Sequence, residues 1–363
     1  MKKTIVVISN DHAWTYNLRK ETLEALIKEG HRVIVLVGYG KRVEDLKAMG
    51  CEFIDVPVDR HGMNPFNELK LLNRYKKILK KIRPDVVLTY TIKPNIYGGY
   101  ACRKLKIPYI ANITGLGTPI ENKGPLQGLF IRMLKAGLKK ASMVFFQNEE
   151  NRDFLISKNA ICGKYDLLPG SGVNLEKFSP IEYPSNETIE FVFISRLMKE
   201  KGIDQYLDTA VAIREKYPNT RFHICGFCEQ DYEKRIEELS QNNVIIYHGM
   251  VDDVREVIKK CHCTVHPTYY PEGMSNVLLE SSACARPIIT TDRSGCREII
   301  DDGINGFIVN QKDSNDLIEK VEKFIALPYE EKRQMGLNGR AKVEKEFDRQ
   351  IVVRKYLEEI NRL

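Results

Sequence analysis

The regular alternation of short apolar runs with longer amphipathic stretches constrains the fold of this chain most. In the first half the apolar runs are Thr4–Ser9, Arg32–Val37, Glu52–Val56, Val86–Thr89, Tyr109–Asn112, Met143–Phe146 and Asp166–Leu168. Most are continuous in Val and Ile, which is typical of parallel strands that are covered on both faces. The stretches between them, such as Asn67–Ile82 and Asn95–Leu105, have helical spacing. This order predicts an α/β fold with an open, doubly wound parallel sheet.

A segment rich in Pro, Gly, Ser and Asn, residues 169–186, interrupts this alternation and reads as a linker. After it the pattern restarts with the apolar runs Glu190–Ile194, Arg221–Cys225, Val244–Tyr247, Cys263–His266, Pro287–Thr290 and Gly306–Val309. Helical stretches lie between these runs too, and one of them is expected at Val251–Lys260. A length of 363 residues also favours two domains over one. We expect two Rossmann-like domains, residues 1–168 and 187–348, facing each other across a cleft. A last helix within residues 349–363 is expected to pack back on the first domain.

The charge of the chain is divided between its halves. Residues 1–168 carry 29 Lys and Arg against 16 Asp and Glu, a net of +13, whereas residues 169–363 carry 27 against 33, a net of −6. Basic residues are dense from Leu69 to Arg83 and again, among apolar residues, from Leu126 to Lys140. Such a pattern fits helices that lie on an anionic bilayer, or equally the solvated face of packed helices. Because the whole first domain is basic, we expect an anionic membrane partner.

Other partners and locations are less compatible with the sequence. The basic stretches lack interleaved aromatic residues and any named nucleic-acid-binding motif, so no nucleic acid is expected. No apolar run reaches the roughly 18 residues of a membrane span, and the run at Thr4–Ser9 is too short for a signal peptide. We therefore expect a cytoplasmic protein that is peripheral on the inner face of the cytoplasmic membrane.

Nine cysteines, an odd number without framework spacing, indicate free thiols in a reducing compartment. The pairs Cys225/Cys228 and Cys261/Cys263 could form part of a zinc site. However, three of these four residues border or belong to apolar strand runs, where free cysteines behave as small hydrophobic residues. The sequence therefore predicts no metal site.

The segment from Pro267 to Glu280 offers the most specific chemistry. A strand-like run ends at Pro267, a loop carries Glu272 and Gly273, and a helix-like run carries Glu280 about two turns inside the helix. Two carboxylates and a row of free backbone amides at a helix start can bind one ligand that has both hydroxyls and phosphates. A sugar nucleotide is such a ligand.

A second candidate is the basic turn from Ser195 to Gly202, which follows a strand and opens a helix. Arg196 and Lys201 could both reach a diphosphate at the strand end, and Gly202 allows close backbone approach. Taken alone, an ordinary solvated basic turn explains this segment as well.

Together these segments, followed by Asp292-Arg-Ser-Gly295-Cys-Arg-Glu298 and Asn305-Gly306-Phe307, resemble glycosyltransferase family 4 over nearly the whole chain. That family consists of retaining enzymes with the GT-B fold, two Rossmann-like domains, that need no metal. The resemblance implies no cofactor besides a nucleotide-sugar co-substrate.

The resemblance also implies roles for individual residues. Arg196 and Lys201 would neutralise the departing diphosphate, Glu272 would face the donor sugar, and Glu280 would accept hydrogen bonds from the ribose. The phosphates would face backbone amides of Gly273, Met274, Ser275, Asn276 and Val277. Main-chain groups around Met250 and Val251 would hold the nucleobase.

The first domain, which carries acceptor specificity in this fold, departs from the commoner family pattern. Its loops carry His12, Arg19, Asn95, Thr114 and Gly115, which we take as acceptor or cleft residues. Lys93 takes the place of a histidine common in the family, so it is a candidate cation near the donor diphosphate, although a plain loop lysine explains it equally well. His12 and His61 are weaker candidates for that role. These features resemble a bacterial subgroup that extends polyprenyl-diphosphate-linked oligosaccharides for capsule, exopolysaccharide, O-antigen or N-glycan assembly.

The sequence therefore predicts a retaining glycosyltransferase that moves a hexose or N-acetylhexosamine from a nucleotide sugar, expected to be UDP-linked, to a lipid-linked saccharide. Two alternatives share the architecture: a nucleotide-sugar epimerase and a non-catalytic sugar-nucleotide-binding protein. Glycoside hydrolysis also uses two carboxylates, but one of this pair lies on a helix beside an anion-binding amide row, which hydrolysis does not use.

Overall fold

The structure, a computed structural model, describes residues 2–59, 62, 64–117, 120, 124–185 and 187–363. The chain divides into two compact units. The first comprises Met1–Gly172, Pro271–Met274 and Arg349–Leu363, and the second comprises Val173–Tyr270 and Ser275–Asp348. The short segment Pro271–Met274 thus belongs to the first unit, although the chain on both sides of it belongs to the second.

A seven-stranded sheet in the order β3-β2-β1-β4-β5-β6-β7 forms the centre of the first unit. All its pairings are parallel. Its strands are β1 (Thr4–Ile8), β2 (Arg32–Val37), β3 (Glu52–Asp55), β4 (Val86–Tyr90), β5 (Tyr109–Ile113), β6 (Met143–Phe146) and β7 (Tyr165–Leu167). The helical elements are α1 (His12–Lys28), α2 (Val43–Ala48), α3 (Pro65–Ile82), η1 (Pro94–Gly98), α4 (Gly99–Leu105), α6 (Pro125–Leu138) and α7 (Glu149–Ser157).

Alternate residues of β1 supply two cores on opposite faces of this sheet. Val6 and Ile8 pack with residues of α3, α4 and α6, whereas Ile5 and Val7 pack with residues of α1 and α14 (Arg349–Arg362). Coverage on both faces explains why the strand runs are continuously apolar.

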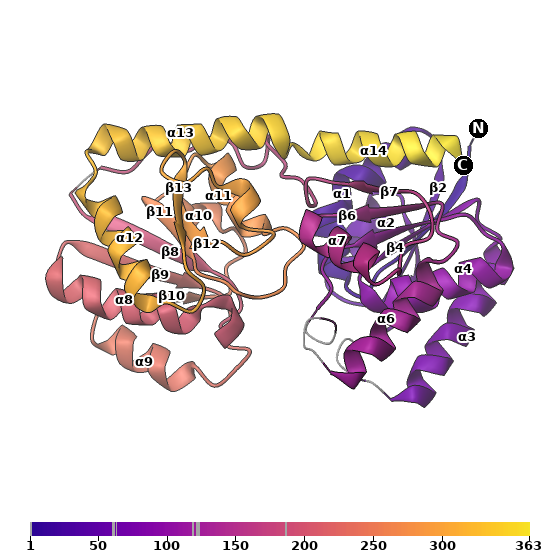
Figure 1. Cartoon of the computed structure of the whole chain (residues 1–363). Coiled ribbons are helices and arrows are strands. Elements are labelled where there is room, and N and C mark those ends of the chain that lie inside the picture. Colours follow the sequence, from indigo (N-terminus) through magenta and orange to yellow (C-terminus); the bar gives the residue numbers. More distant parts are fainter. Residues whose placement is uncertain (1, 60–61, 63, 118–119, 121–123, 186) are drawn as a thin grey trace. The chain divides into compact units, whose positions relative to one another are not determined.

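A six-stranded parallel sheet in the order β10-β9-β8-β11-β12-β13 forms the centre of the second unit. Its strands are β8 (Ile189–Ile194), β9 (Thr220–Cys225), β10 (Ile246–Gly249), β11 (Cys263–His266), β12 (Ile288–Thr291) and β13 (Gly306–Val309). The helical elements are η2 (Lys199–Lys201), α8 (Ile203–Lys216), α9 (Glu233–Gln241), α10 (Arg255–Ile258), α11 (Asn276–Ala283), η3 (Arg297–Ile299), α12 (Ser314–Ala326) and α13 (Tyr329–Glu346). Figure 1 shows α8, α9 and α12 on one face of this sheet. The predicted α/β class with two doubly wound parallel sheets is confirmed.

The last helix belongs to the first unit. Arg349, its first residue, is buried and donates to both carboxylate oxygens of Glu21 at 3.0 and 2.8 Å. The same guanidinium donates to the carbonyl oxygens of Gly172 at 3.0 Å and Asn17 at 3.1 Å. Farther along, Tyr356 packs against Tyr90 and Phe145 of the sheet. These contacts fix α14 on α1, on Gly172 and on the sheet of the first unit.

Several predicted elements differ from the structure. The helix expected after β10 is shorter, since only Arg255–Ile258 is helical, and the helix α2 lies in a stretch for which none was predicted. The helix expected from Asn95 begins as a π-helical turn, Pro94–Gly98. In the described part of the chain, no helix is long and apolar enough to cross a membrane.

Candidate functional site

The basic turn after β8 is held tightly against the end of β11. Gly202 has a left-handed φ of +77°, and an added Cβ there would lie 2.1 Å from the carbonyl oxygen of Pro267. The carbonyl oxygen of Glu200 accepts from the Tyr269 amide at 2.9 Å and from the Thr268 hydroxyl at 3.3 Å. Only glycine fits this approach without strain. The two loops that carry the predicted donor residues of the second unit are therefore joined by backbone contacts.

Arg196 and Lys201 gather at one aromatic ring. The guanidinium carbon of Arg196 lies 5.6 Å from the centroid of the Tyr270 ring, and Lys201 Nζ lies 4.6 Å from the same centroid. Arg196 also forms an ion pair with Glu229, which lies between β9 and α9. Both partners of this pair are partly exposed. The structure thus brings the two predicted diphosphate cations together and adds a tyrosine and a carboxylate that no sequence pattern had indicated.

The start of α11 agrees only in part with the prediction from the sequence. Glu280 is the fifth residue of this eight-residue helix, so it lies about one turn inside it and not two. The amide of Ser275, the N-cap residue, donates to the carbonyl oxygen of Gly295 at 2.8 Å and so has a partner within the protein. This part of the expected amide row is wrong. The Gly295 loop is in turn fixed by Glu298, whose carboxylate accepts from the Gly295 amide at 2.7 Å.

The segment that contains Glu272 and Gly273 is clamped within the first unit. Asn148 Nδ2 donates to the carbonyl oxygens of Gly273 at 2.6 Å and Glu272 at 3.1 Å. A Cβ at Gly273 would lie 2.3 Å from Gln147 Oε1 and 2.5 Å from the Thr114 carbonyl oxygen, so no larger residue fits. Thr114 and Gly115, predicted acceptor residues, therefore lie beside the backbone of the predicted sugar-facing loop. Asn148 and Gln147 were missed because nothing in their neighbourhood on the chain marks them.

The loop after β10 is shaped by a bulge. Tyr247 pairs with Ile224 and Gly249 with Cys225, so His248 is the extra residue. Gly249 then has a φ of +62°, and Met250, at the predicted nucleobase site with Val251, is 70 % exposed.

Side chains of two neighbouring strands hold the bulge residue His248 in place. His248 Nε2 lies 2.9 Å from His223 Nδ1, and His223 Nε2 lies 2.7 Å from Glu190 Oε2. Burial lowers the pKa of His248, and the neighbouring His223 and Lys260 lower it further. We therefore expect a neutral His248 at neutral pH.

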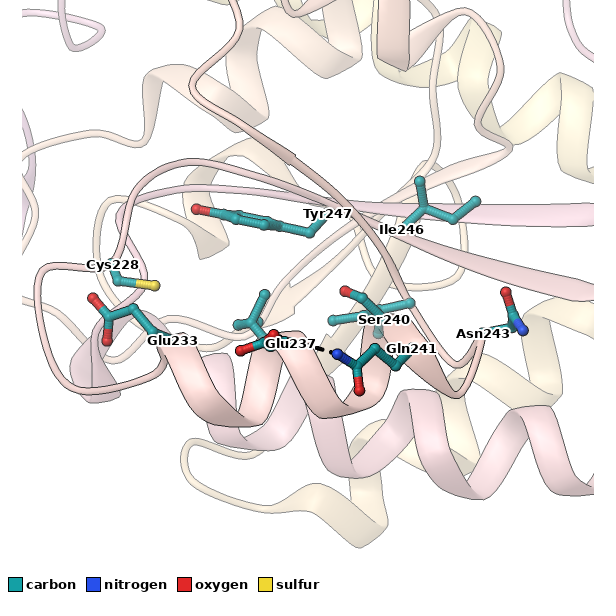
Figure 2. A pocket seen from close by; sticks show the side chains of 10 residues that line it. Cys228, Glu233, Glu237, Ser240, Gln241, Asn243, Ile246 and Tyr247 are labelled. Atoms are coloured by element: carbon teal, nitrogen blue, oxygen red, sulfur yellow. Dashed lines mark hydrogen bonds between the residues drawn. The ribbon is translucent and has the colours of Figure 1, made fainter.

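A separate groove of about 690 Å³ lies between α9 and the edge strand β10 (Figure 2). It is lined by Cys228, Glu233, Ile236, Glu237, Ser240, Gln241, Asn243, Ile245, Ile246 and Tyr247. None of the predicted donor residues lies in it. Since ligands of doubly wound sheets bind at the carboxyl ends of the strands, we place the candidate donor site at the loops after β8 and β11.

The predicted residues of the first unit have varied surroundings. Lys93 Nζ bonds with Glu68 Oε1 at 2.5 Å and with the Gly62 carbonyl oxygen at 2.6 Å, so this lysine already has an anionic partner. Asn95 is buried and bonds with the Thr89 hydroxyl at 2.6 Å, which gives it a structural role.

The remaining candidates lie on α1 or outside the described residues. His12 Nδ1 accepts from the Arg42 amide at 3.4 Å. Arg19 is buried with its guanidinium 4.5 Å from the centroid of the Tyr90 ring. His61 lies outside the residues that the structure describes.

The cysteines of the second unit are mostly buried thiols. Burial raises the pKa of Cys225 to about 11 and the pKa values of Cys261 and Cys263 well above the ordinary range. These thiols are therefore protonated at neutral pH, which suits packing residues. In the described ranges, no three His, Cys, Asp or Glu side chains form a group that could hold a metal ion.

Comparisons with known families agree with this architecture. Residues 5–148 match the family model "Glycosyl transferase 4-like", and residues 176–342 match the model "Glycosyl transferases group 1". The chain therefore belongs to the glycosyltransferases, because each of its halves matches one of these two family models.

Relatives of similar length support this assignment. The chain is 27% identical, over 98% of both chains, to the N,N'-diacetylbacillosaminyl-diphospho-undecaprenol alpha-1,3-N-acetylgalactosaminyltransferase of Campylobacter jejuni. It is also 27% identical to the capsular polysaccharide biosynthesis glycosyltransferase CapM of Staphylococcus aureus, over 92% of this chain and 91% of CapM. A third relative, 22% identical over 72% of both chains, is the UDP-Gal:alpha-D-GlcNAc-diphosphoundecaprenol alpha-1,3-galactosyltransferase of Escherichia coli.

Solved structures show the same fold at low sequence identity. Anabaena HepE in complex with UDP-glucose matches with a TM-score of 0.81 and 16% identity, over 99% of this chain and 100% of HepE. A glycosyltransferase from Rickettsia africae matches with a TM-score of 0.81 and 21% identity, over 99% and 98% of the two chains.

Proposed function

We propose that this glycosyltransferase transfers a hexose or N-acetylhexosamine from a UDP-linked donor to a saccharide carried on a lipid diphosphate. The observation that carries the proposal is the pair of cations, Arg196 and Lys201, gathered at the Tyr270 ring beside the strand end. Such a pair is suited to a diphosphate, because negative charge builds up on the leaving group during transfer. The relatives that act on diphospho-undecaprenol acceptors, together with CapM, favour a lipid-linked acceptor in surface-polysaccharide or glycan assembly.

In the proposed mechanism Glu280 accepts hydrogen bonds from the ribose, and Glu272 faces the donor sugar. The Glu272 loop has a fixed backbone because Asn148 holds its carbonyl oxygens, which favours a defined sugar position. Main-chain groups around Met250 and Val251 contact the base.

We propose a retaining reaction that needs no metal. The acceptor hydroxyl attacks the anomeric carbon on the face from which the diphosphate leaves. The anomeric carbon–oxygen bond breaks, and the departing phosphate oxygen takes the hydroxyl proton. Arg196 and Lys201 stabilise the negative charge on the diphosphate, so they do the work that a metal ion does in other phosphate sites.

We further propose that the first unit rests on an anionic membrane. Apolar residues are exposed at the start of two basic helices, with exposed fractions of 83 % for Phe66, 57 % for Leu69, 52 % for Leu126 and 51 % for Leu129. In Figure 1 both α3 and α6 extend to the lower edge of this unit. Exposed apolar side chains beside lysines are suited to the boundary between headgroups and acyl chains.

The donor is tested by a thermal-shift screen of UDP, GDP and their sugars, in which we expect stabilisation by UDP compounds. Transfer is then tested with the donor so identified and a lipid-diphosphate-linked disaccharide, in buffer with EDTA. Anomeric coupling in the NMR spectrum of the product should show retained configuration. An inverted product would exclude the proposed mechanism, and loss of transfer with EDTA would exclude metal independence.

The membrane proposal has its own test. The protein should sediment with liposomes that contain phosphatidylglycerol more than with neutral ones, and Phe66→Ser with Leu129→Ser should reduce this sedimentation. Equal sedimentation with both kinds of liposome would exclude the proposal.

A further inference from the structure

Tyr270 and Glu229 surround the two proposed diphosphate cations, and neither has a role in the function described so far. Tyr270 lies in the loop that follows β11 and presents one ring to both Arg196 and Lys201. Glu229 reaches Arg196 from the loop between β9 and α9. All four residues belong to the second unit.

The loop that carries Glu229 is fixed to the basic turn by several bonds. The amides of Glu229 and Gln230 donate to the Leu197 carbonyl oxygen at 3.1 and 3.3 Å, and Gln230 Oε1 accepts from the Lys199 amide at 2.8 Å. The Leu197 amide donates to the Phe227 carbonyl oxygen at 2.8 Å. The position of the Glu229 backbone is therefore set by the same turn that carries Arg196.

The aromatic contact of Tyr270 and the ion pair of Glu229 differ in whether they are compatible with a bound diphosphate. An aromatic ring attracts a cation through its quadrupole, holds no net charge, and leaves the donor N–H groups of the cation available to an anion. A carboxylate, by contrast, uses the N–H groups that a phosphate would need. The Tyr270 ring can therefore stay in contact with both cations when the diphosphate is bound, whereas the Glu229 carboxylate must release Arg196.

We propose that Tyr270 is a positioning residue that holds Arg196 and Lys201 for the donor diphosphate, and that Glu229 is an internal counter-ion that the diphosphate displaces. This inference rests on the proposed function, because it assumes that the two cations bind a diphosphate. Before a diphosphate binds, Glu229 limits the repulsion between the cations. The diphosphate carries more negative charge than one carboxylate and can therefore displace Glu229, although breaking the ion pair with Arg196 lowers the affinity.

The test measures the affinities of UDP and pyrophosphate by calorimetry, with uridine as a ligand that lacks phosphate. Tyr270→Leu removes the ring and should weaken UDP and pyrophosphate about tenfold, within the range for a desolvated cation–aromatic contact. Tyr270→Phe keeps the ring and should rescue this loss. The affinity for uridine should be the same in all variants, whereas a merely structural defect would lower it as well.

Glu229→Gln gives an effect of opposite sign. Removal of the competing carboxylate should tighten UDP and pyrophosphate by up to about fivefold, as expected for a partly exposed ion pair. Glu238→Gln, an exposed change of the same charge on α9, is the matched control and should leave both affinities unaltered. A gain that is equal in Glu229→Gln and Glu238→Gln would reflect net charge alone and would overturn the counter-ion role.

The outcomes separate this inference from the function on which it rests. If wild type binds neither UDP nor pyrophosphate, and Arg196→Ala changes nothing, the proposed function fails. If wild type binds UDP through Arg196 but Tyr270→Leu and Tyr270→Phe bind equally well, the positioning role of Tyr270 is wrong. If Tyr270→Leu does not fold, the Glu229→Gln result decides, and unchanged or weaker UDP binding would overturn the proposal.

Discussion

His262 should make the second unit less stable in mild acid. This histidine is almost fully buried; its Nδ1 accepts from the Glu190 amide at 3.0 Å, and its Nε2 lies 2.9 Å from the Ser185 carbonyl oxygen. Burial lowers the pKa of His262 to about 4. Because Nδ1 accepts a hydrogen bond from the backbone N–H of Glu190, the neutral ring is the form that the fold holds.

The size of the effect follows from linkage. An unfolded histidine has a pKa of about 6.5, so the unfolded chain binds the proton first as the pH falls. Stability is therefore lost between about pH 6.5 and pH 4, and not as the pH rises. At pH 5 the single-site expression gives a loss of about 2 kcal/mol relative to pH 7.5.

The assay is urea unfolding followed by far-UV circular dichroism at pH 7.5 and pH 5. His262→Asn keeps an amide oxygen that can accept from the Glu190 amide but cannot be protonated. Between the two pH values, wild type should lose about 2 kcal/mol more of its free energy of unfolding than the variant. Other titrating groups, His248 among them, are common to both proteins and cancel. Equal losses would refute the buried neutral state of His262.

Three further predictions concern the fold and the site. Arg349→Met removes the buried guanidinium that pairs with the Glu21 carboxylate and should cost about 3–5 kcal/mol of the free energy of unfolding, measured by fluorescence of Trp14, the single tryptophan, in urea. A loss below about 1 kcal/mol would contradict the anchoring of α14. Gly202→Ala should destabilise the chain far more than Gly249→Ala. Both glycines have a positive φ, but only a Cβ added at Gly202 would clash with the Pro267 carbonyl oxygen. Equal melting temperatures of the two variants would contradict this close approach. Gly273→Ala should lower turnover more than tenfold, because the Glu272 loop must shift, and unchanged turnover would show that this loop does not position the sugar.

The fold could be predicted from the sequence because both sheets are covered on both faces. This coverage produces continuous apolar runs, and the predicted strands at Arg32–Val37, Met143–Phe146 and Cys263–His266 have the same bounds as β2, β6 and β11. The helix α2 was missed because its six residues are too few to show a helical period. The spacing of Val251–Lys260 predicts a helix, but after β10 the chain first forms a loop and only Arg255–Ile258 is helical.

The site could be predicted only where its residues lie close together along the chain. Arg196 and Lys201 are five residues apart, so their common function could be inferred from one turn. Their contacts with Glu229 and Tyr270 cross 33 residues or more and need the fold. For the same reason the ion pair of Lys93 could not be predicted, because its partner Glu68 lies 25 residues earlier in the chain.

The central claim is that the chain transfers a sugar from a UDP-linked donor to a lipid-linked acceptor. The most direct measurement uses a labelled UDP-sugar with and without a lipid-diphosphate-linked saccharide, and follows both the labelled lipid and the released UDP. We predict label in the lipid extract and an equal amount of UDP only when the acceptor is present, with both products lost in Arg196→Ala. Conversion of the donor to another UDP-sugar without acceptor would contradict a transferase and indicate an epimerase.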